Sequence, residues 1–265
     1  MDFGHFRNAF LQALWPEFDV IEPALRIVDV APRTVLLKPD EPVQQVWFPL
    51  AGSLSVIGSM PNGAQVQACA VGREGALGLV EALNDRVSGF TVACPVGARL
   101  SICTAEAFRS FHADSELVRD LTLQHAGDLV HALITEAACH GVHSVEARLC
   151  RWLLECDERA DAANMRLTQE VLASLLGVQR TTVCQMMNGL QAAGLVSTAR
   201  GTIQLINRPG LRRRACGCEP RAGTQGLGVV VGPKALSRVG RELSPQPWTA
   251  DRPLRGFSPR RVSAS

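Results

Sequence analysis

Residues 168–205 constrain the fold more than any other part of the chain. They read TQEVLASLLGVQRTTVCQMMNGLQAAGLVSTARGTIQL. Thr168 can cap a first helix, because a hydroxyl placed before an apolar helical face accepts a bond from an unpaired backbone N–H. Apolar residues then recur at helical spacing until Gly177, which can adopt the left-handed backbone of a tight turn. The segment therefore predicts a short helix that ends in a glycine turn.

A second helix is expected from about residue 179 to residue 193. Its polar side carries Gln179, Arg180, Thr181, Thr182 and Gln185, whereas its inward side carries Val183, Met186, Met187 and Leu190. Two short helices joined by a glycine turn, the second with a polar N-terminal half, are typical of a helix-turn-helix that places its second helix in a DNA major groove.

Two β-rich runs follow Gly194, at residues 195–198 and 202–206, and they flank Ala199-Arg200-Gly201. This pattern predicts the wing of a winged helix. An ordinary helical pair packed in a bundle is the alternative, but the wing and the polar stretch favour DNA binding. The residues that we expect to contact DNA are Thr168, Gln179, Arg180, Thr181, Thr182, Gln185 and Arg200.

The distribution of charge supports double-stranded DNA as the partner. The net charge is only +2, but residues 1–211 carry 16 Lys and Arg against 22 Asp and Glu, whereas residues 212–265 carry 11 against 3. Residues 166–208 hold four arginines and a single acid, Glu170, and phosphate attraction requires such a positive zone. The basic tail, rich in Gly, Pro, Ser and Arg, is expected to be disordered, either as an inert extension or as a basic arm that adds non-specific DNA affinity.

The nine cysteines are scattered, and their odd number argues against a disulfide framework. Cys216 and Cys218 form the only close pair, but a single residue between them is not the usual zinc or redox spacing. Cys139 lies near four histidines, at 125, 131, 140 and 143, where a solvated helix end is favoured over a metal site. No metal and no cofactor are therefore expected. Without a signal peptide or an apolar run of membrane-spanning length, the expected location is the cytoplasm.

The part of the chain before residue 140 predicts a sensor domain. Residues 3–29 are expected to be rich in helix, and residues 33–103 contain short β-rich runs separated by Pro, Gly and Asn. Asn62-Gly63 between two of these runs is a hairpin signal. Several short strands with regular turns indicate an antiparallel barrel or jelly roll.

A short helix and then a long one starting near Asp114 should fill residues 106–138. The long helix carries an apolar stripe, which we interpret as a homodimer seam rather than a cover for the barrel, since one helix-turn-helix reads only a half-site. This stripe comprises Leu117, Leu121, Ala126, Leu129, Val130, Leu133 and Ala137. Residues 140–143 are expected to form a hinge. The predicted domains are 1–113 (sensor), 114–142 (connecting helix and hinge), 143–211 (winged helix) and 212–265 (tail), giving an α+β fold overall.

With a barrel, a long helix and a winged helix in this order, residues 10–218 resemble the Crp/Fnr family of bacterial transcription regulators. The resemblance is strongest in residues 144–154 (SVEARLCRWLL) and 167–205. The family pattern in the recognition helix is Arg-Glu-Thr-Val followed two residues later by Arg. Arg180 and Thr182 match this pattern, which implies that Arg180 contacts a base edge or a phosphate and Thr182 a phosphate. Thr181 and Gln185 depart from it, so a different operator is expected, because glutamine suits adenine better than guanine.

The effector side departs further from the family. Cyclic-nucleotide-binding members carry a Gly-Glu-x-Ala/Gly-Leu run, in which Glu holds the ribose, and a downstream Arg that pairs with the phosphate. Aligned on Gly75, the ribose Glu is replaced by Ala76, and Glu74 lies two residues early. The candidate effector pocket comprises Gly72, Glu74, Gly75, Ala76, Leu77, Arg86 and Ser88. Cyclic AMP is disfavoured as the effector.

The sequence thus predicts a homodimeric DNA-binding transcription regulator with a sensor barrel, and RNA polymerase as a further partner. The alternative is a cyclic-nucleotide-binding module that acts through protein contacts. An enzyme is not expected, because no catalytic constellation stands out. Members of the family that the chain resembles sense oxygen with an iron–sulfur cluster held by cysteines near the N-terminus. No cysteine precedes Cys69 here, so the resemblance disfavours that role.

Overall fold

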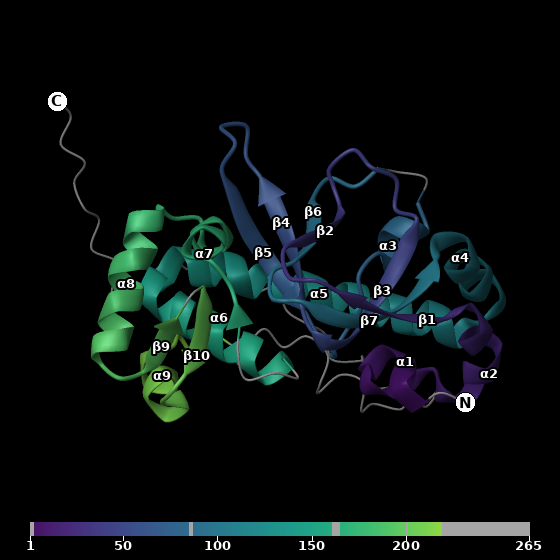
Figure 1. Ribbon diagram of the computed structural model, residues 1–265. Helices are drawn as coiled ribbons and strands as arrows, with labels where there is room; N and C mark the ends of the chain where they lie inside the picture. Colours follow the sequence, from purple (N-terminus) through teal and green to yellow (C-terminus); the bar gives the residue numbers. More distant parts are fainter. Residues whose placement is uncertain (1–2, 85–86, 161–164, 200, 219–265) are drawn as a thin grey trace, which may run out of the picture. The chain divides into compact units, whose positions relative to one another are not determined.

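A computed structural model describes residues 3–84, 87–160, 165–199 and 201–218 (Figure 1). The described chain is an α+β structure, with antiparallel strands in its N-terminal part, the long helix α5 (Glu116–Val142) and a C-terminal winged helix. The predicted fold class is therefore confirmed. Residues 219–265, for which disorder was expected, lie outside the described residues.

The N-terminal segment forms short helices, as predicted, but it ends in a strand that the sequence pattern did not show. The helices are α1 (Ala9–Ala13), α2 (Phe18–Ile21) and three short 3-10 helices (Phe3–Arg7, Trp15–Glu17 and Glu22–Ala24). Strand β1 (Arg26–Val30) follows and pairs antiparallel with β7 (Ala98–Thr104). The expectation of helix up to residue 29 was wrong, because hydrogen bonds to a partner about 70 residues away decide this stretch.

Two antiparallel sheets form the N-terminal β-structure. One has the order β1-β7-β3, with β3 at Gln45–Gly52. The other has the order β2-β6-β4-β5, with strands at Thr34–Leu37, Thr91–Cys94, Leu54–Ser59 and Gln65–Val71. The Asn62-Gly63 hairpin is present, with Gly63 at a φ of +80°. Within the described residues the two sheets do not close into one continuous barrel, and they have the strand layout of a jelly roll.

Apolar side chains from both sheets share one buried core. It includes Trp47, Leu54, Val71 and Leu100, and Leu129 and Leu133 of α5 pack against it. A second core joins the N-terminal helices to α3 (Leu79–Ala82), α4 (Ala105–Asp114) and the start of α5. The space between the sheets is therefore filled by side chains, as in a small barrel.

Serine and threonine caps set the helix starts that follow. Thr104, Ser115 and Ser144 each accept a hydrogen bond from a backbone N–H of the first turn of α4, α5 and α6 (Val145–Arg159), respectively. The predicted break within residues 140–143 was placed too early, because α5 remains helical through Val142 and the chain changes direction at His143, whose backbone is extended.

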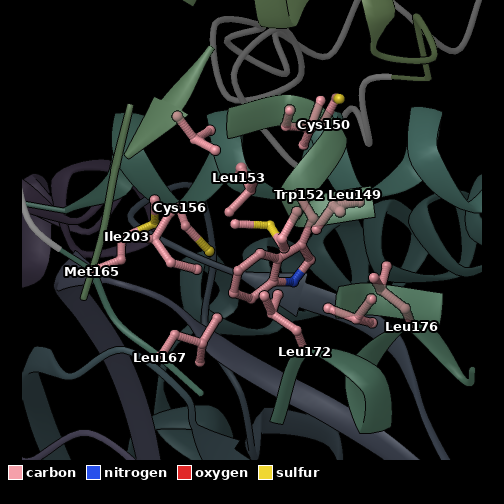
Figure 2. Packing of buried hydrophobic residues seen from close by; sticks show 14 of the residues in the cluster. Leu149, Cys150, Trp152, Leu153, Cys156, Met165, Leu167, Leu172, Leu176 and Ile203 are labelled. Atoms are coloured by element: carbon pink, nitrogen blue, oxygen red, sulfur yellow. The ribbon is translucent and has the colours of Figure 1, made fainter. Parts of the chain in front are cut away.

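The winged helix comprises α6, β8 (Met165–Arg166), α7 (Gln169–Leu176), α8 (Arg180–Ala192), β9 (Val196–Ala199), β10 (Thr202–Leu205) and α9 (Arg208–Arg214). Its strands form a third sheet in the order β8-β10-β9. Figure 2 shows Trp152 surrounded by aliphatic and sulfur-containing side chains from α6, α7 and this sheet. The first residues of the predicted tail are folded, since α9 runs through Arg214 and Cys216 is buried.

Among the described residues, none of the helices is long and apolar enough to cross a membrane. The boundaries proposed for the four domains stay predictions.

Candidate nucleic-acid interface

Local geometry positions α7 and α8 as the sequence predicts. The Thr168 hydroxyl accepts a hydrogen bond from the backbone N–H of Val171 at 3.3 Å, which caps α7. Gly177 ends α7 with a φ of +67°, in the left-handed region that favours glycine. Val183, Met187 and Leu190 of α8 are buried in the domain core, so the opposite face of α8 is held outward.

The N-terminal half of α8 presents polar side chains to solvent. Gln179, Arg180, Thr181 and Gln185 are exposed, and Thr182 is half-buried. The Gln179 side chain makes no capping hydrogen bond. The first backbone N–H groups of α8 therefore lack a capping side chain, and a helix N-terminus of this kind attracts phosphate.

The wing lies beside these helices. A groove of about 400 Å³ is lined by Thr168 and Gln169 at the start of α7, by Arg180 and Met187 of α8, and by strand residues that include Thr198 and Thr202. Thr168 and Arg180, which the sequence singled out separately, thus line one concave surface. Arg200, also predicted to contact DNA, lies outside the described residues.

Most arginines near the end of the winged helix are already paired. Arg208 binds Asp157 at 2.6 Å, Arg212 binds Glu158 at 2.7 Å and Arg214 binds Glu146 at 3.1 Å. Arg180 forms no ion pair with any residue that the structure describes. Its guanidinium therefore remains available to a ligand.

The long helix carries two apolar stripes, and the predicted dimer seam combines residues of both. Leu121, Leu129 and Leu133 pack against the β-structure and its helices. For these three residues the alternative interpretation, that the stripe covers the barrel, is therefore correct. Val130 and Ala137 are exposed. The outward stripe comprises Leu123, Gly127, Val130, Ile134, Ala137 and Gly141, with Leu123 76% and Ile134 61% exposed in the single chain.

The candidate effector residues are occupied by contacts within the protein. The Glu74 carboxylate accepts a hydrogen bond from the Gly72 N–H at 2.9 Å and pairs with Arg159 of α6 at 2.6 Å. Ser88 is buried, and its hydroxyl donates to the Phe90 carbonyl at 2.7 Å. Leu77 exchanges backbone hydrogen bonds with Trp47. Arg86 lies outside the described residues.

Gly75 and Ala76 pack against His125 of α5. A Cβ added at Gly75 would lie only 2.4 Å from Cε1 of His125. The His125 Nε2–H donates to the Ala76 carbonyl at 2.7 Å. Burial lowers the pKa of His125, against the opposing effects of this hydrogen bond and of the Asp128 and Glu74 charges. The imidazole is therefore neutral near pH 7. The turn at Gly75 and Ala76 packs against α5.

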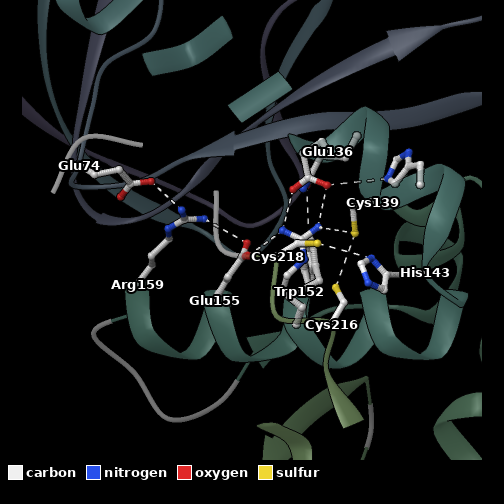
Figure 3. A network of polar contacts seen from close by, with 12 residues as sticks. Glu74, Glu136, Cys139, His143, Trp152, Glu155, Arg159, Cys216 and Cys218 are labelled. Atoms are coloured by element: carbon white, nitrogen blue, oxygen red, sulfur yellow. Dashed lines mark hydrogen bonds and ion pairs between the residues drawn. The ribbon is translucent and has the colours of Figure 1, made fainter. Parts of the chain in front are cut away.

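A buried ionic network between the strands and helices α5 and α6 was not visible in the sequence. Arg159 pairs with Glu74 and Glu155, and Arg151 pairs with Glu155 at 2.9 Å and with both carboxylate oxygens of Glu136 at 2.7 Å (Figure 3). These residues come from the turn after β5, from α5 and from α6. In the sequence they are ordinary charges on helix faces, and only the i,i+4 pairs along α6 could have been inferred.

A second contact joins Trp152 of α6 to the sheet β2-β6-β4-β5. The indole N–H donates to Gln67 Oε1 at 3.1 Å, and the same oxygen accepts from the Ser55 hydroxyl at 2.7 Å. Helix α6, which begins the winged helix, is therefore joined to the turn after β5 by the Glu74–Arg159 ion pair and to strand β5 by the Trp152–Gln67 hydrogen bond.

Residues 147–214 match the model of the Crp-like helix-turn-helix domain. No curated protein sequence matches the chain. Among solved structures, a CRP-family transcriptional regulator from Thermus thermophilus is similar with a TM-score of 0.61 and 18% identity, over 73% of this chain and 99% of that one.

Two further structures are similar. The first is a transcriptional regulator of the Crp/Fnr family from Eubacterium rectale, with a TM-score of 0.57 and 18% identity over 76% of this chain and 96% of that one. The second is the c-di-GMP-responsive global regulator CLP of Xanthomonas campestris, with a TM-score of 0.55 and 17% identity over 72% and 98%.

Proposed function

We propose that this chain is a transcription regulator of the Crp/Fnr type that binds a specific DNA operator through α8 and the wing; its Crp-like helix-turn-helix domain and its fold support this. The observation that carries the proposal is the exposed, uncapped N-terminal half of α8 beside the groove that Arg180 and Thr168 line. Side chains at the start of a recognition helix reach base edges, while its N–H groups and hydroxyls contact phosphates.

The residue types at the start of α8 define the expected base preference. Arg180 is suited to a guanine, with two donors for its O6 and N7 atoms, and Gln185 is suited to an adenine. Thr181 presents a hydroxyl where the family pattern has an acid that would accept from cytosine. The operator should therefore contain a guanine that Arg180 contacts. It should differ from the operators of members with the usual family pattern at the base pairs that face residues 181 and 185.

The first experiment selects bound sequences from a random DNA pool and then measures affinity as a function of salt. Arg180→Ala should weaken binding to the selected site by about 1–3 kcal/mol, that is, roughly 5- to 150-fold, and should relax the preference at one position. Arg99→Ala is the matched control, because Arg99 is an exposed arginine of the β-structure that pairs only loosely with Asp29 at 4.0 Å. Unchanged specificity in Arg180→Ala would refute α8 as the reading helix.

We also propose that the outward stripe of α5 is the seam of a homodimer. Its six residues recur at alternating steps of four and three, which is the heptad spacing of a two-helix contact. The stripe contains three large exposed side chains, Leu123, Val130 and Ile134. Its other three residues, Gly127, Ala137 and Gly141, are small, so two copies of the helix can approach closely. A dimer also supplies the second recognition helix that a palindromic operator requires.

Sedimentation velocity tests this seam. Ile134→Asp should give monomers at concentrations where the unchanged protein is dimeric, because two unpaired carboxylates would be buried in the seam. Val20→Asp is the matched control, since Val20 of α2 is similarly exposed, at 67% against 61% for Ile134. A dimer that survives Ile134→Asp would place the contact elsewhere.

For the sensor, we propose that cyclic AMP is not bound in the usual way. Glu74 is held by Arg159, Ala76 stands where the ribose-binding Glu of the family is expected, and buried side chains such as Trp47 fill the space between the sheets. Calorimetric titration with cyclic AMP and with cyclic di-GMP tests this, the second because the Xanthomonas regulator responds to it. Heat of binding that saturates at one cyclic AMP per chain would refute it.

A further inference from the structure

Four potential metal ligands converge where the last turn of α5 meets the segment that follows α9. They are Cys139, His143, Cys216 and Cys218, and their ligand atoms all lie within 4.8 Å of one another. Two come from α5 and its cap, and two come from a segment about 75 residues further along the chain. Figure 3 shows the three sulfur atoms and the imidazole turned toward one another.

The two shortest distances in this cluster fit a single tetrahedral ion. The Sγ atoms of Cys139 and Cys216 are 3.6 Å apart, and Sγ of Cys218 lies 3.5 Å from Nδ1 of His143. With Zn–S bonds of about 2.3 Å and Zn–N bonds of about 2.0 Å, a tetrahedron has S···S edges of about 3.8 Å and S···N edges of about 3.5 Å. Two of the six edges therefore already match such a tetrahedron, and the other four are no longer than 4.8 Å.

Other uses of the cysteines fit this geometry less well. A disulfide between Cys139 and Cys216 would require the sulfurs at about 2.05 Å, far closer than 3.6 Å. An iron–sulfur cluster would have to place several iron and sulfide ions between the thiolates, and four ligand atoms within 4.8 Å of one another leave room for a single ion.

One guanidinium faces a thiolate of such a site. Three thiolates and a neutral imidazole around Zn²⁺ carry a net negative charge. The Arg151 guanidinium lies 3.9 Å from Sγ of Cys139 and is itself held by Glu136 (Figure 3). A donor beside a metal-bound thiolate, fixed by its own carboxylate partner, is a usual feature of metal sites. Cys139 and Cys216 are buried, whereas His143 and Cys218 reach solvent and leave an entry path.

We propose that Cys139, His143, Cys216 and Cys218 form a mononuclear Cys₃His site for a zinc-class transition metal. Four protein ligands close the coordination sphere, so the site is structural rather than catalytic. A metal there would tie the segment after α9 to the end of α5, beside the hydrogen bond that the Cys216 N–H donates to the Ala147 carbonyl at 3.2 Å. It would thereby hold the end of the winged helix against the connecting helix.

The test is metal analysis of the full chain, purified under reducing conditions without added chelator, followed by titration of the metal-free protein with Co²⁺ and Zn²⁺. About one zinc ion per chain is expected, and Co²⁺ should give the visible bands of tetrahedral cobalt with thiolate-to-metal charge transfer. Cys216→Ser and His143→Ala should weaken zinc affinity by more than about 100-fold, since loss of an outer contact alone costs about 10- to 100-fold.

Two variants separate ligand loss from general damage. Cys184→Ser is the matched control, because Cys184 is a partly exposed thiol on α8 that donates to Gln169 Oε1, so it should retain the metal. His143→Cys should also retain it as a Cys₄ site, with stronger charge-transfer absorption. Circular dichroism checks that each variant keeps its helices.

Three outcomes would overturn the proposal. The first is a folded protein that takes up neither Zn²⁺ nor Co²⁺. The second is retention of the metal in a folded Cys216→Ser variant with unchanged affinity. The third is a disulfide between Cys139 and Cys216 detected by mass spectrometry in protein purified separately without reductant, which would assign the pair to redox chemistry. None of these measurements depends on whether α8 reads DNA.

Discussion

Removal of Arg151 should destabilise the protein more than removal of its partner Glu136. The side chains of Arg151 and Glu136 are 9% and 7% exposed, so both charges are withdrawn from water. In Arg151→Met, the described group nearest to Glu136 that could carry a positive charge is His140 at 4.0 Å, but burial lowers the pKa of His140, so its imidazole is neutral near pH 7. Glu155 keeps Arg159 at 3.6 Å. One buried carboxylate is then almost unpaired, and the expected cost is about 3–5 kcal/mol.

Removal of the Glu136 charge leaves Arg151 with a second carboxylate partner. In Glu136→Gln, Arg151 still pairs with Glu155 at 2.9 Å, and the new amide oxygen still accepts one hydrogen bond. The expected cost is about 1–3 kcal/mol. The double variant Glu136→Met/Arg151→Met removes both charges and fills similar volume, so it should be more stable than Arg151→Met by at least about 2 kcal/mol.

Urea unfolding followed by circular dichroism measures these differences, with a chelator present so that metal binding adds nothing. Equal costs for the two single variants, or a double variant whose cost equals their sum, would refute this account of the network.

Four other substitutions have defined outcomes. Gly177→Ala should lower the free energy of unfolding by about 1–2 kcal/mol, because φ is +67° there, whereas Gly189→Ala, in open space on α8, should raise it by about 0.5–1 kcal/mol; urea midpoints measure both. Trp152→Phe should lower the free energy of unfolding by about 1–2 kcal/mol in the same assay, because the hydrogen bond that the indole N–H donates to Gln67 Oε1 is lost. Because burial lowers the pKa of His125 below its unfolded value of 6.5, its contribution to stability is complete above pH 6.5 and is lost as the pH falls toward the folded pKa. His125→Gln should flatten that part of the stability–pH curve, and an unchanged slope would contradict the assignment.

Much of the fold follows from local signals in the sequence. The caps Thr168 and Ser144 and the turn at Gly177 lie where the sequence indicated, because a helix start or a tight turn depends on residues within one or two turns of it. The polar face of α8 follows from helical periodicity in the same way. These features carry the proposal that the protein reads DNA.

Wherever a residue had to be assigned to one partner among several, the sequence was insufficient. Residues 26–30 are a strand because β7 offers them hydrogen bonds, and nothing nearby in the chain shows this. On α5 every face carries apolar residues, so periodicity did not separate Leu129, which covers the β-structure, from Ile134, which is exposed. Packing against the sheets decides between the two stripes.

The sequence by itself determined the winged helix-turn-helix, because its helices, turn and wing are each specified by residues close together in the chain. The tertiary structure alone decided what Cys216 and Glu74 contact. Spacing along the chain made the cysteine pair look inert, and the family resemblance made Glu74 a candidate effector residue. Folding places Cys216 beside Cys139 and pairs Glu74 with Arg159. Contacts between residues 70 or more apart in the chain depend on how whole helices and sheets pack.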